Sequence, residues 1–250
     1  MPSLSYETVG DPGQPTIMLL HGFMSSNAQW LLNTGPLSQR FHLVLVELWG
    51  HGDSPETRAP ADYSIARYLA EFETLRSALN ISQWHLIGQS YGAGIVLNYA
   101  LSHPDVTGKV MVTNSRSAFG DISATAKGNQ RQSRRPDHVR DLPLHPINAR
   151  RFPAHVKQAL VRSADQMSMT TIELSGSLAS ELQFSDKLNA LEKQVMLANG
   201  KYEKAFQPEV QRLRKRHPAL SITDLEGGHS INIEDPNGFN EAAMAFFETD

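Results

Sequence analysis

Short apolar runs alternate with longer amphipathic runs over the first 113 residues of the chain. This alternation is typical of a mostly parallel sheet whose two faces are covered by helices. The apolar runs end in loops rich in Gly, polar residues or His, where open α/β sheets place their ligands. The pattern predicts buried strands at 16–20, 43–47, 84–88 and 109–113, and helices at 65–79, closed by Asn80, and at 91–103.

The alternation stops after Thr113. Residues 116–162 are polar, contain several prolines and offer no buried strand, and residues 164–182 have a helix-like pattern rich in Met, Ser and Leu. We therefore expect a core formed by residues 1–116 and 186–250, with residues 117–185 inserted as a helical cap. Within the second part of that core, the pattern predicts strands at 194–198 and 220–224 and helices at 208–216 and 237–247.

The overall composition excludes several classes of protein. The chain has 250 residues and a formal net charge of −3, which does not indicate a nucleic-acid binder or a disordered tail. It has no cysteine, which excludes a thiol nucleophile and a disulfide framework. No apolar run approaches the roughly 18 residues of a membrane span, so we expect a cytoplasmic protein without a membrane partner. The oligomeric state stays open.

The segment Gly88-Gln89-Ser90-Tyr91-Gly92 lies between a predicted strand and a predicted helix. A serine between small residues on such a turn has its hydroxyl oxygen exposed for nucleophilic attack. The alternative is a turn serine whose hydroxyl caps the helix. The choice depends on whether the chain also supplies a base and a group to orient that base.

Two further residues supply those groups. His229, in Gly227-Gly228-His229-Ser230, directly follows the last predicted strand and is the best candidate base among ten histidines. Glu203 comes just after the preceding predicted strand and is the candidate acid that orients the base. The chain order Ser90, Glu203, His229 is the nucleophile, acid and base order of one particular fold.

On these residues the chain resembles the capped α/β-hydrolases over nearly everything outside residues 117–185. The resemblance implies the α/β-hydrolase fold, with a mostly parallel sheet flanked by helices and an inserted helical cap. It also implies that the backbone N–H groups of Phe23 and Tyr91 form an oxyanion hole; the serine turn independently supports Tyr91. The matching segments, in the order of the family, are His21-Gly22-Phe23, Gly50-His51-Gly52-Asp53-Ser54, the turn at Ser90, Asn199-Gly200-x-x-Glu203, and Gly228-His229 followed by Glu234-x-Pro236-x-x-Phe239.

The chain departs from the family pattern at the acid. Family members usually have Asp where this chain has Glu203, so Asp121 and Asp224 remain rival acids. Asn114 stands where some relatives have the acid, but an amide cannot replace the charge of a carboxylate. Glu47 also stands in place of an Asp, and we interpret that residue as structural.

His21 and His51 are interpreted as structural residues that bond to the backbone and order the site. A metal site is not expected, because Glu47, His51 and Asp53 have no recognised ligand spacing. The proposed chemistry needs no cofactor.

We therefore expect a serine hydrolase that cleaves a carboxylic ester of a small molecule through an acyl-enzyme. Lactonases, thioesterases and carbon–carbon bond hydrolases use the same triad, so all three stay open. The spacing Asn199-Gly200-x-x-Glu203-x-x-Phe206 resembles that of acyl-homoserine lactone hydrolases of this fold. A ligand receptor built on the same fold, with slow or no turnover, is the alternative from another class.

The predicted cap carries a local excess of positive charge. Residues 116–162 contain ten basic and three acidic side chains, so their formal net charge is 10 − 3 = +7. The formal net charge of the whole chain is −3. Such a surface is either a solvated helical face or a means of attracting an anionic substrate. The apolar residues of the cap either pack on the core or line an acyl pocket; they are Met167, Met169, Ile172, Leu174, Leu178 and Leu182.

Overall fold

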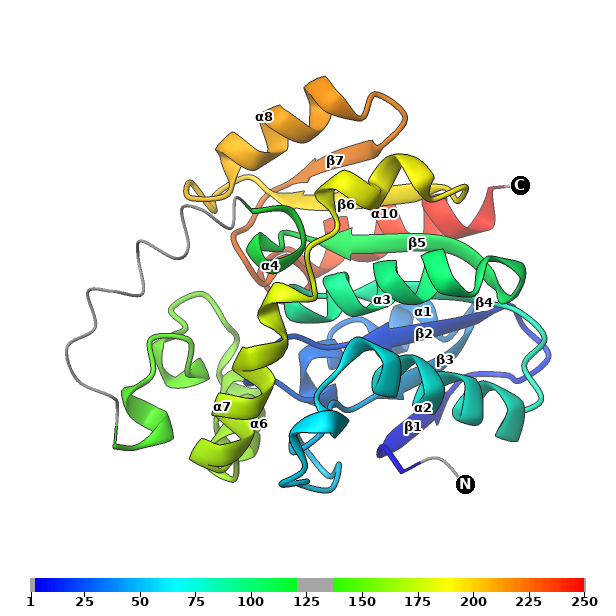
Figure 1. Cartoon of the computed structure of the whole chain (residues 1–250). Coiled ribbons are helices and arrows are strands. Elements are labelled where there is room, and N and C mark those ends of the chain that lie inside the picture. Colours follow the sequence, from blue (N-terminus) through cyan, green and yellow to red (C-terminus); the bar gives the residue numbers. More distant parts are fainter. Residues whose placement is uncertain (1–2, 121–136, 250) are drawn as a thin grey trace.

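The computed structural model describes residues 3–120 and 137–249. Within these residues, a seven-stranded sheet has the order β1-β3-β2-β4-β5-β6-β7 (Figure 1). The edge strand β1 pairs antiparallel with β3, and all the other pairs are parallel. The mostly parallel sheet predicted from the sequence is therefore confirmed. The strands are β1 (Tyr6–Val9), β2 (Thr16–Leu20), β3 (His42–Val46), β4 (Trp84–Gly88), β5 (Thr107–Thr113), β6 (Val195–Gly200) and β7 (Ser221–Leu225).

Helices cover both faces of the sheet, as expected for strands that read as continuous apolar runs. Alternate strand residues point to opposite faces, so Met18 and Leu20 of β2 join one core cluster while Ile17 and Leu19 join the other. The first cluster lies beneath α2, α3 and α8, and the second beneath α1 and α10. The helices are α1 (Thr34–Leu37), α2 (Ile65–Ala78), α3 (Tyr91–Ser102), α4 (Arg116–Phe119), α6 (Ala154–Asp165), α7 (Met169–Ser177), α8 (Gln207–Arg216), α9 (Ile231–Glu234) and α10 (Pro236–Glu248).

Helix α2 has the boundaries that its sequence signals predict. The Ser64 side chain accepts a hydrogen bond from the Arg67 N–H and caps the start of the helix. Asn80, just past the end, has a φ of 55°, in the left-handed region that commonly ends a helix. The predicted closure at Asn80 is confirmed.

The single helix-like segment predicted at 164–182 is wrong. The structure has α6 ending at Asp165 and α7 beginning at Met169, followed by a short 3-10 turn at Leu178–Ser180. The Ser168 side chain accepts a hydrogen bond from the Thr171 N–H, which starts a new helix instead of continuing the old one. Most of α6 lies in the stretch that appeared only polar, because its buried residues are few and widely spaced: Val156, Leu160 and Ala164.

The apolar residues of the predicted cap pack on the protein. Met167 and Ile172 form a small cluster with Met24 and Val139, with Met169 against it. Leu178 and Leu182 belong to the large core cluster, and Leu174 packs against that cluster. None of these side chains lines the cavity described below, so the packing interpretation is confirmed.

Between β5 and β6 the structure describes residues 114–120, which contain α4, and residues 137–194. Helix α6 packs on the loop after β2 through Val156, Leu160, Ala28 and Leu32. This loop belongs to the carboxyl edge of the parallel strands, near which Figure 1 shows α6 and α7. The division into a core at 1–116 and 186–250 and a cap at 117–185 stays a prediction.

In the described ranges, none of the helices is both long and apolar enough to cross a lipid bilayer. The cytoplasmic location expected from the sequence stays a prediction.

Candidate active site

Ser90 lies on the tight turn between β4 and α3. Its φ of 51° and ψ of −108° are unusual for a residue with a side chain. Its side chain makes no capping hydrogen bond, so the helix-cap alternative for Ser90 is wrong. The Ser90 N–H donates to the Thr113 hydroxyl at 3.1 Å, which ties the turn to the end of β5.

Close contact with main-chain atoms requires a glycine at position 92, two residues after Ser90. A Cβ added at Gly92 would lie 2.6 Å from the carbonyl oxygens of both Leu20 and His21. These are main-chain atoms of β2 and its loop, so they cannot rotate away as a side-chain end could. Gly92 thus allows α3 to start directly against β2.

We expect Gly92→Ala to lower the free energy of unfolding by about 3 kcal/mol or more, because the added methyl group overlaps main-chain atoms. Gly176→Ala is the matched control, since a Cβ at this α7 position meets no atom within 4 Å. That control should raise the stability by up to about 1 kcal/mol through the better helix propensity of Ala. Urea unfolding curves measure both changes, and equal stability of the two variants would contradict this account of the turn.

His229 follows β7 and lies between Ser90 and Glu203. Its Nδ1 is 3.0 Å from Glu203 Oε1, and its Nε2 is 2.9 Å from Ser90 Oγ. A carboxylate can only accept hydrogen bonds, so Nδ1–H donates to Glu203. In the neutral ring Nε2 then accepts from the Ser90 hydroxyl, which is the tautomer that a base acting on Ser90 requires.

Glu203 is held in place by contacts between loops. Its Oε2 accepts a hydrogen bond from Asn114 Nδ2 at 2.9 Å, and the same amide group donates to the Gly200 carbonyl at 3.1 Å. A Cβ at Gly200 would lie 1.8 Å from the Gly228 carbonyl oxygen, so the loop that carries Glu203 directly touches the loop that carries His229. Asn114 therefore lies in the site as a partner of the carboxylate, a role that its sequence position did not indicate.

The rival acid Asp224 has other partners. Its carboxylate accepts hydrogen bonds from Arg214, at 2.8 Å to both oxygens, and from Asn199 at 2.8 Å. Among the described residues, the carboxylate that accepts a hydrogen bond from His229 is that of Glu203. The other rival, Asp121, lies outside the described residues.

Two opposing influences act on the imidazole of His229. Burial by the surrounding loops is the largest single influence and lowers its pKa. The hydrogen bond and the charge of Glu203, and then the charge of Glu234, raise it. The side chain keeps 42% of its surface exposed, which limits the cost of charging the ring. The net result is that the pKa of His229 is raised above its ordinary 6.5.

Phe23 and Tyr91 lie beside Ser90, with ring centroids 5.8 Å apart. Phe23 belongs to the loop after β2, and Tyr91 is the first residue of α3. Within residues 3–120 and 137–249, neither main-chain N–H has a hydrogen-bond acceptor. Both N–H groups are thus free to donate to a ligand, as the oxyanion-hole prediction requires, although their catalytic role stays a prediction.

His21 and His51 are buried and bonded to the backbone, which confirms their structural interpretation. The Nδ1–H of His21 donates to the Gly22 carbonyl at 2.8 Å, and its Nε2 accepts from the Leu48 N–H at 3.2 Å. His51 donates to the Trp49 carbonyl at 2.9 Å and accepts from the Met24 N–H at 3.2 Å. Burial lowers the pKa of His21 to about 3 and that of His51 to about 4, so both rings are neutral.

Glu47 is also structural, as expected. Its Oε1 accepts the Asn27 N–H at 3.0 Å and its Oε2 accepts the Asp53 N–H at 2.5 Å. One carboxylate thus ties together the loops that follow β2 and β3. In the described parts of the chain, no group of three or more His, Cys, Asp or Glu residues could hold a metal ion.

A buried chain of amides links the loop after β2 to the loop that carries His229. The Ser25 hydroxyl donates to Gln29 Oε1 at 2.8 Å, and Gln29 Nε2 donates to Asn232 Oδ1 at 2.8 Å. Asn232 Nδ2 in turn donates to Asn33 Oδ1 at 3.1 Å, and Asn33 Nδ2 donates to Asn240 Oδ1 at 2.8 Å. Asn232 lies three residues after His229, so this chain fixes the base relative to the loop of Phe23.

A cavity of about 460 Å³ opens beside Ser90 and His229. Residues 143–152 form one wall, and the rest comes from the loops after β2, β4, β6 and β7 and from Leu160 of α6. The large apolar side chains of this lining include Phe23, Met24, Leu144, Phe152 and Leu160. A cavity that combines apolar walls with the Ser90 hydroxyl is where a substrate would be expected to bind.

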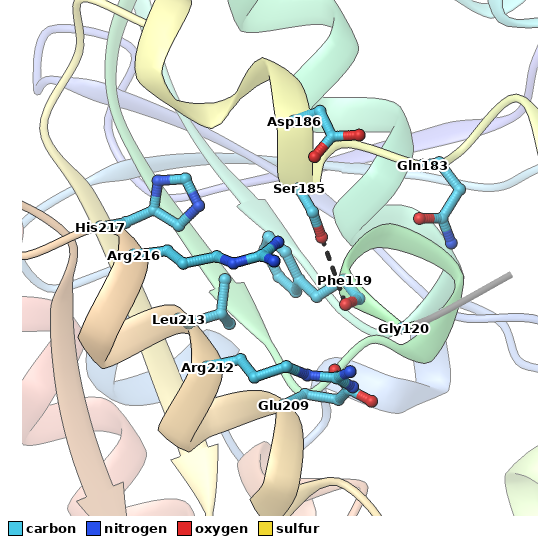
Figure 2. Close-up of a pocket in the computed structure, with 10 residues that line it drawn as sticks. All are labelled: Phe119, Gly120, Gln183, Ser185, Asp186, Glu209, Arg212, Leu213, Arg216 and His217. Carbon is cyan, nitrogen blue, oxygen red and sulfur yellow. Dashed lines mark hydrogen bonds and ion pairs between the residues drawn. The ribbon is translucent and has the colours of Figure 1, made fainter. Parts of the chain in front are cut away.

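Figure 2 shows a second cavity of about 450 Å³, between the end of α4 and α8. Two polar interactions join residues of its lining. Arg212 pairs with Glu209, and the Ser185 hydroxyl donates a hydrogen bond to the Phe119 carbonyl at 3.2 Å. Its lining includes none of Ser90, Glu203 and His229. The candidate active site is therefore the first cavity, although the two volumes are nearly equal.

Comparison with known proteins gives a family for this arrangement. A family model described as "alpha/beta hydrolase fold" matches residues 15–236. The protein "Putative carbamate hydrolase RutD" of Caulobacter vibrioides is 26% identical over 279 residues, covering 98% of this chain and 95% of that protein. Uncharacterized proteins of Mycobacterium bovis and Mycobacterium tuberculosis are 30% identical over 109 residues, but the match covers only 31% of their length.

Two solved structures illustrate the similarity of fold. A hydrolase from Pseudomonas aeruginosa PA01 has a TM-score of 0.82 and 19% identity, covering 98% of this chain and 94% of that one. The enol-lactonase from Burkholderia xenovorans LB400 has a TM-score of 0.74 and 18% identity, covering 98% and 96% of the two chains. At these identities the likeness concerns the fold.

Proposed function

The chain belongs to the alpha/beta hydrolase fold family, and from this premise we propose that it is a serine hydrolase that cleaves a carboxylic ester. The observation that carries the proposal is the continuous hydrogen-bonded chain from Ser90 Oγ through His229 to Glu203, with distances of 2.9 and 3.0 Å. A hydroxyl held by a base, which is itself held by a carboxylate, is an activated nucleophile.

The first half of the reaction forms an acyl-enzyme. Ser90 Oγ attacks the ester carbonyl carbon while His229 Nε2 takes the hydroxyl proton, and Glu203 stabilises the charged ring. The N–H groups of Phe23 and Tyr91 donate to the oxyanion that develops; one such donor typically contributes about 3–4 kcal/mol of transition-state stabilisation. His229 then gives the proton to the leaving alcohol, which departs as the carbon–oxygen bond breaks.

The second half regenerates the serine. A water molecule gives a proton to His229 Nε2 and attacks the acyl carbon, and the same two N–H groups hold the second oxyanion. Collapse of this intermediate breaks the bond to Ser90 Oγ, which recovers its proton from His229. The products are the carboxylic acid and the alcohol, and neither half requires a cofactor.

Other carbonyl substrates suit the same three residues. Lactones, thioesters and the substrates of carbon–carbon bond hydrolases are all cleaved after the same activation of a serine. The named function of RutD adds carbamates to this group, since that relative covers almost the whole chain. A hydrolysis panel of short and long acyl esters, lactones, acyl thioesters and a carbamate separates these classes by kcat/KM. A ligand receptor on this fold would bind such compounds but turn over none of them at a useful rate.

The reaction should have an acid limit set by His229. The base must be neutral to accept the Ser90 proton, and the pKa of His229 is raised above its ordinary 6.5. We therefore expect kcat/KM for an uncharged ester to fall as the pH drops through an apparent pKa above 6.5. A profile measured from about pH 5 to about pH 9 locates this limb. A limb centred below 6.5 would contradict this prediction and would mean that burial outweighs the stabilisation of the charged ring by Glu203 and Glu234.

A further inference from the structure

Two adjacent arginines, Arg150 and Arg151, line the cavity that contains Ser90 and His229. They lie in the loop just before α6, within the basic stretch noted in the sequence. Other basic residues of that stretch have different surroundings: Arg140 pairs with Asp165, and Lys157 donates to the Ala149 carbonyl at 2.7 Å. In the described part of the stretch, these two are the Arg or Lys side chains that border the cavity.

Arg151 is held next to the candidate base. Its Nη1 is 3.1 Å from Glu234 Oε2, and its guanidinium lies over the Tyr202 ring, 5.5 Å from the centroid. Glu234 also accepts the Gly228 N–H at 2.9 Å, and a Cβ at Gly228 would be 3.2 Å from Arg151 Nη1. These contacts hold the guanidinium beside Gly228, the residue before His229, without the help of a ligand.

Much of the hydrogen-bonding capacity of Arg151 is unused. A guanidinium has five N–H donors, and among the residues that the structure describes only Glu234 accepts from this one. The Arg151 side chain is 58% exposed although it is anchored on two sides. Its free donors can thus reach a ligand in the cavity.

The acidic side chains of the cavity are already engaged. Glu203 bonds to His229 and Asn114, and Glu234 bonds to Gly228 and Arg151. Within residues 3–120 and 137–249, Arg150 forms no ion pair with any of them. The wall formed by residues 143–152 thus presents two positive charges, and Arg150 has no acidic partner among the residues that the structure describes.

We propose that the cavity binds an ester that also carries a carboxylate, and that Arg151, with Arg150 beside it, holds this carboxylate next to the reacting carbonyl. The inference rests on the proposed hydrolase function and names the class of its substrate. A planar guanidinium matches a carboxylate through paired hydrogen bonds, and one that is already fixed loses little freedom when it binds. Leu144, Phe152 and Leu160 provide an apolar surface for the uncharged body of the same substrate.

A pair of substrates of similar length tests this. The first is p-nitrophenyl hydrogen glutarate, which ends in a carboxylate, and the second is p-nitrophenyl pentanoate, which is uncharged. The quantity to compare is the ratio of their kcat/KM values in the wild type, Arg151→Gln, Arg150→Gln and Arg162→Gln. Arg162 is the matched control, because it is an exposed arginine of α6 outside the cavity.

We expect the wild type to prefer the charged ester, and Arg151→Gln to lower this preference about ten- to hundred-fold by loss of a charge-assisted hydrogen bond. Arg150→Gln should lower it less, and Arg162→Gln should change it less than about two-fold, as a screened distant charge would. An unchanged ratio in Arg151→Gln overturns the inference. If the ratio is unchanged because kcat/KM falls equally for both esters, Arg151 only holds Glu234 and its loop.

The same assays test the proposed hydrolase function separately from the proposed carboxylate binding. Turnover of the uncharged ester that is lost in Ser90→Ala supports the hydrolase whatever the ratio is. If neither ester is turned over, glutarate binding to the wild-type protein, measured by calorimetry, still decides the inference. Binding that weakens at least about ten-fold in Arg151→Gln supports it. Absence of binding, or equal binding to both proteins, overturns it.

Discussion

Ser90→Ala is expected to reduce kcat for ester hydrolysis about 10⁴- to 10⁶-fold while the protein stays folded. The variant removes the oxygen that is 2.9 Å from His229 Nε2 and that is proposed to attack the carbonyl of the substrate. The Ser90 side chain does not cap α3, so its loss should leave the turn intact. The remaining rate would come from the oxyanion donors and from binding, as in other enzymes whose nucleophile is removed.

The measurement is a steady-state assay on the best ester of the hydrolysis panel, with thermal unfolding to show that the variant is folded. Ser102→Ala is the matched control, since Ser102 is an exposed serine at the other end of the same helix. It should retain the wild-type rate. If Ser90→Ala also retains that rate, the serine mechanism is wrong, and covalent labelling of Ser90 by a fluorophosphonate should then fail too.

Glu203→Gln should lower kcat about 10⁴-fold with little effect on KM. The Glu203 carboxylate accepts the Nδ1–H of His229 at 3.0 Å and thereby keeps Nε2 free to take the Ser90 proton. A glutamine can present its NH₂ group to Nδ1 instead, which would place the ring proton on Nε2, where it blocks the base. The charge that stabilises the protonated ring is lost as well.

The same variant makes a second, independent prediction about pH. Glu203 raises the pKa of His229 against the effect of burial, so removing its charge should lower that pKa. The acid limb of the residual activity should therefore move to lower pH than in the wild type. Asp224→Asn is the control: Asp224 pairs with Arg214 and Asn199, and its loss should leave both kcat and the limb unchanged. Near-wild-type activity of Glu203→Gln would transfer the acid role to another carboxylate, with Asp121→Asn the next variant to measure.

Apart from the partly exposed edge strand β7, the strands that could be read from the sequence are largely buried on both faces. β2, for example, consists of five buried residues and appears as a continuous apolar run. β1 was missed because it is an edge strand whose residues, Tyr6–Val9, are largely exposed, so it has no apolar run to detect. Its pairing with β3 depends on backbone hydrogen bonds, which leave no trace in the side-chain pattern.

The supporting residues of the site could not be read from the sequence for a related reason. Gln29 and Asn232 are 203 positions apart, and nothing local in either segment indicates that their side chains bond. The same holds for Asn114 and Glu203, 89 positions apart. Such buried amides are recognised as partners only when the loops at the carboxyl edge of the sheet are packed together.

The sequence by itself determined the α/β architecture and named Ser90, Glu203 and His229, because burial and strand-to-helix turns impose short-range patterns on the chain. The tertiary structure decided which of these groups meet, and it placed two of the ten basic residues of the 116–162 stretch, Arg150 and Arg151, at one cavity. The physical reason is that hydrogen bonds and ion pairs act over a few ångströms in space. Distances of that size between segments far apart in sequence are set by how the loops pack on the sheet.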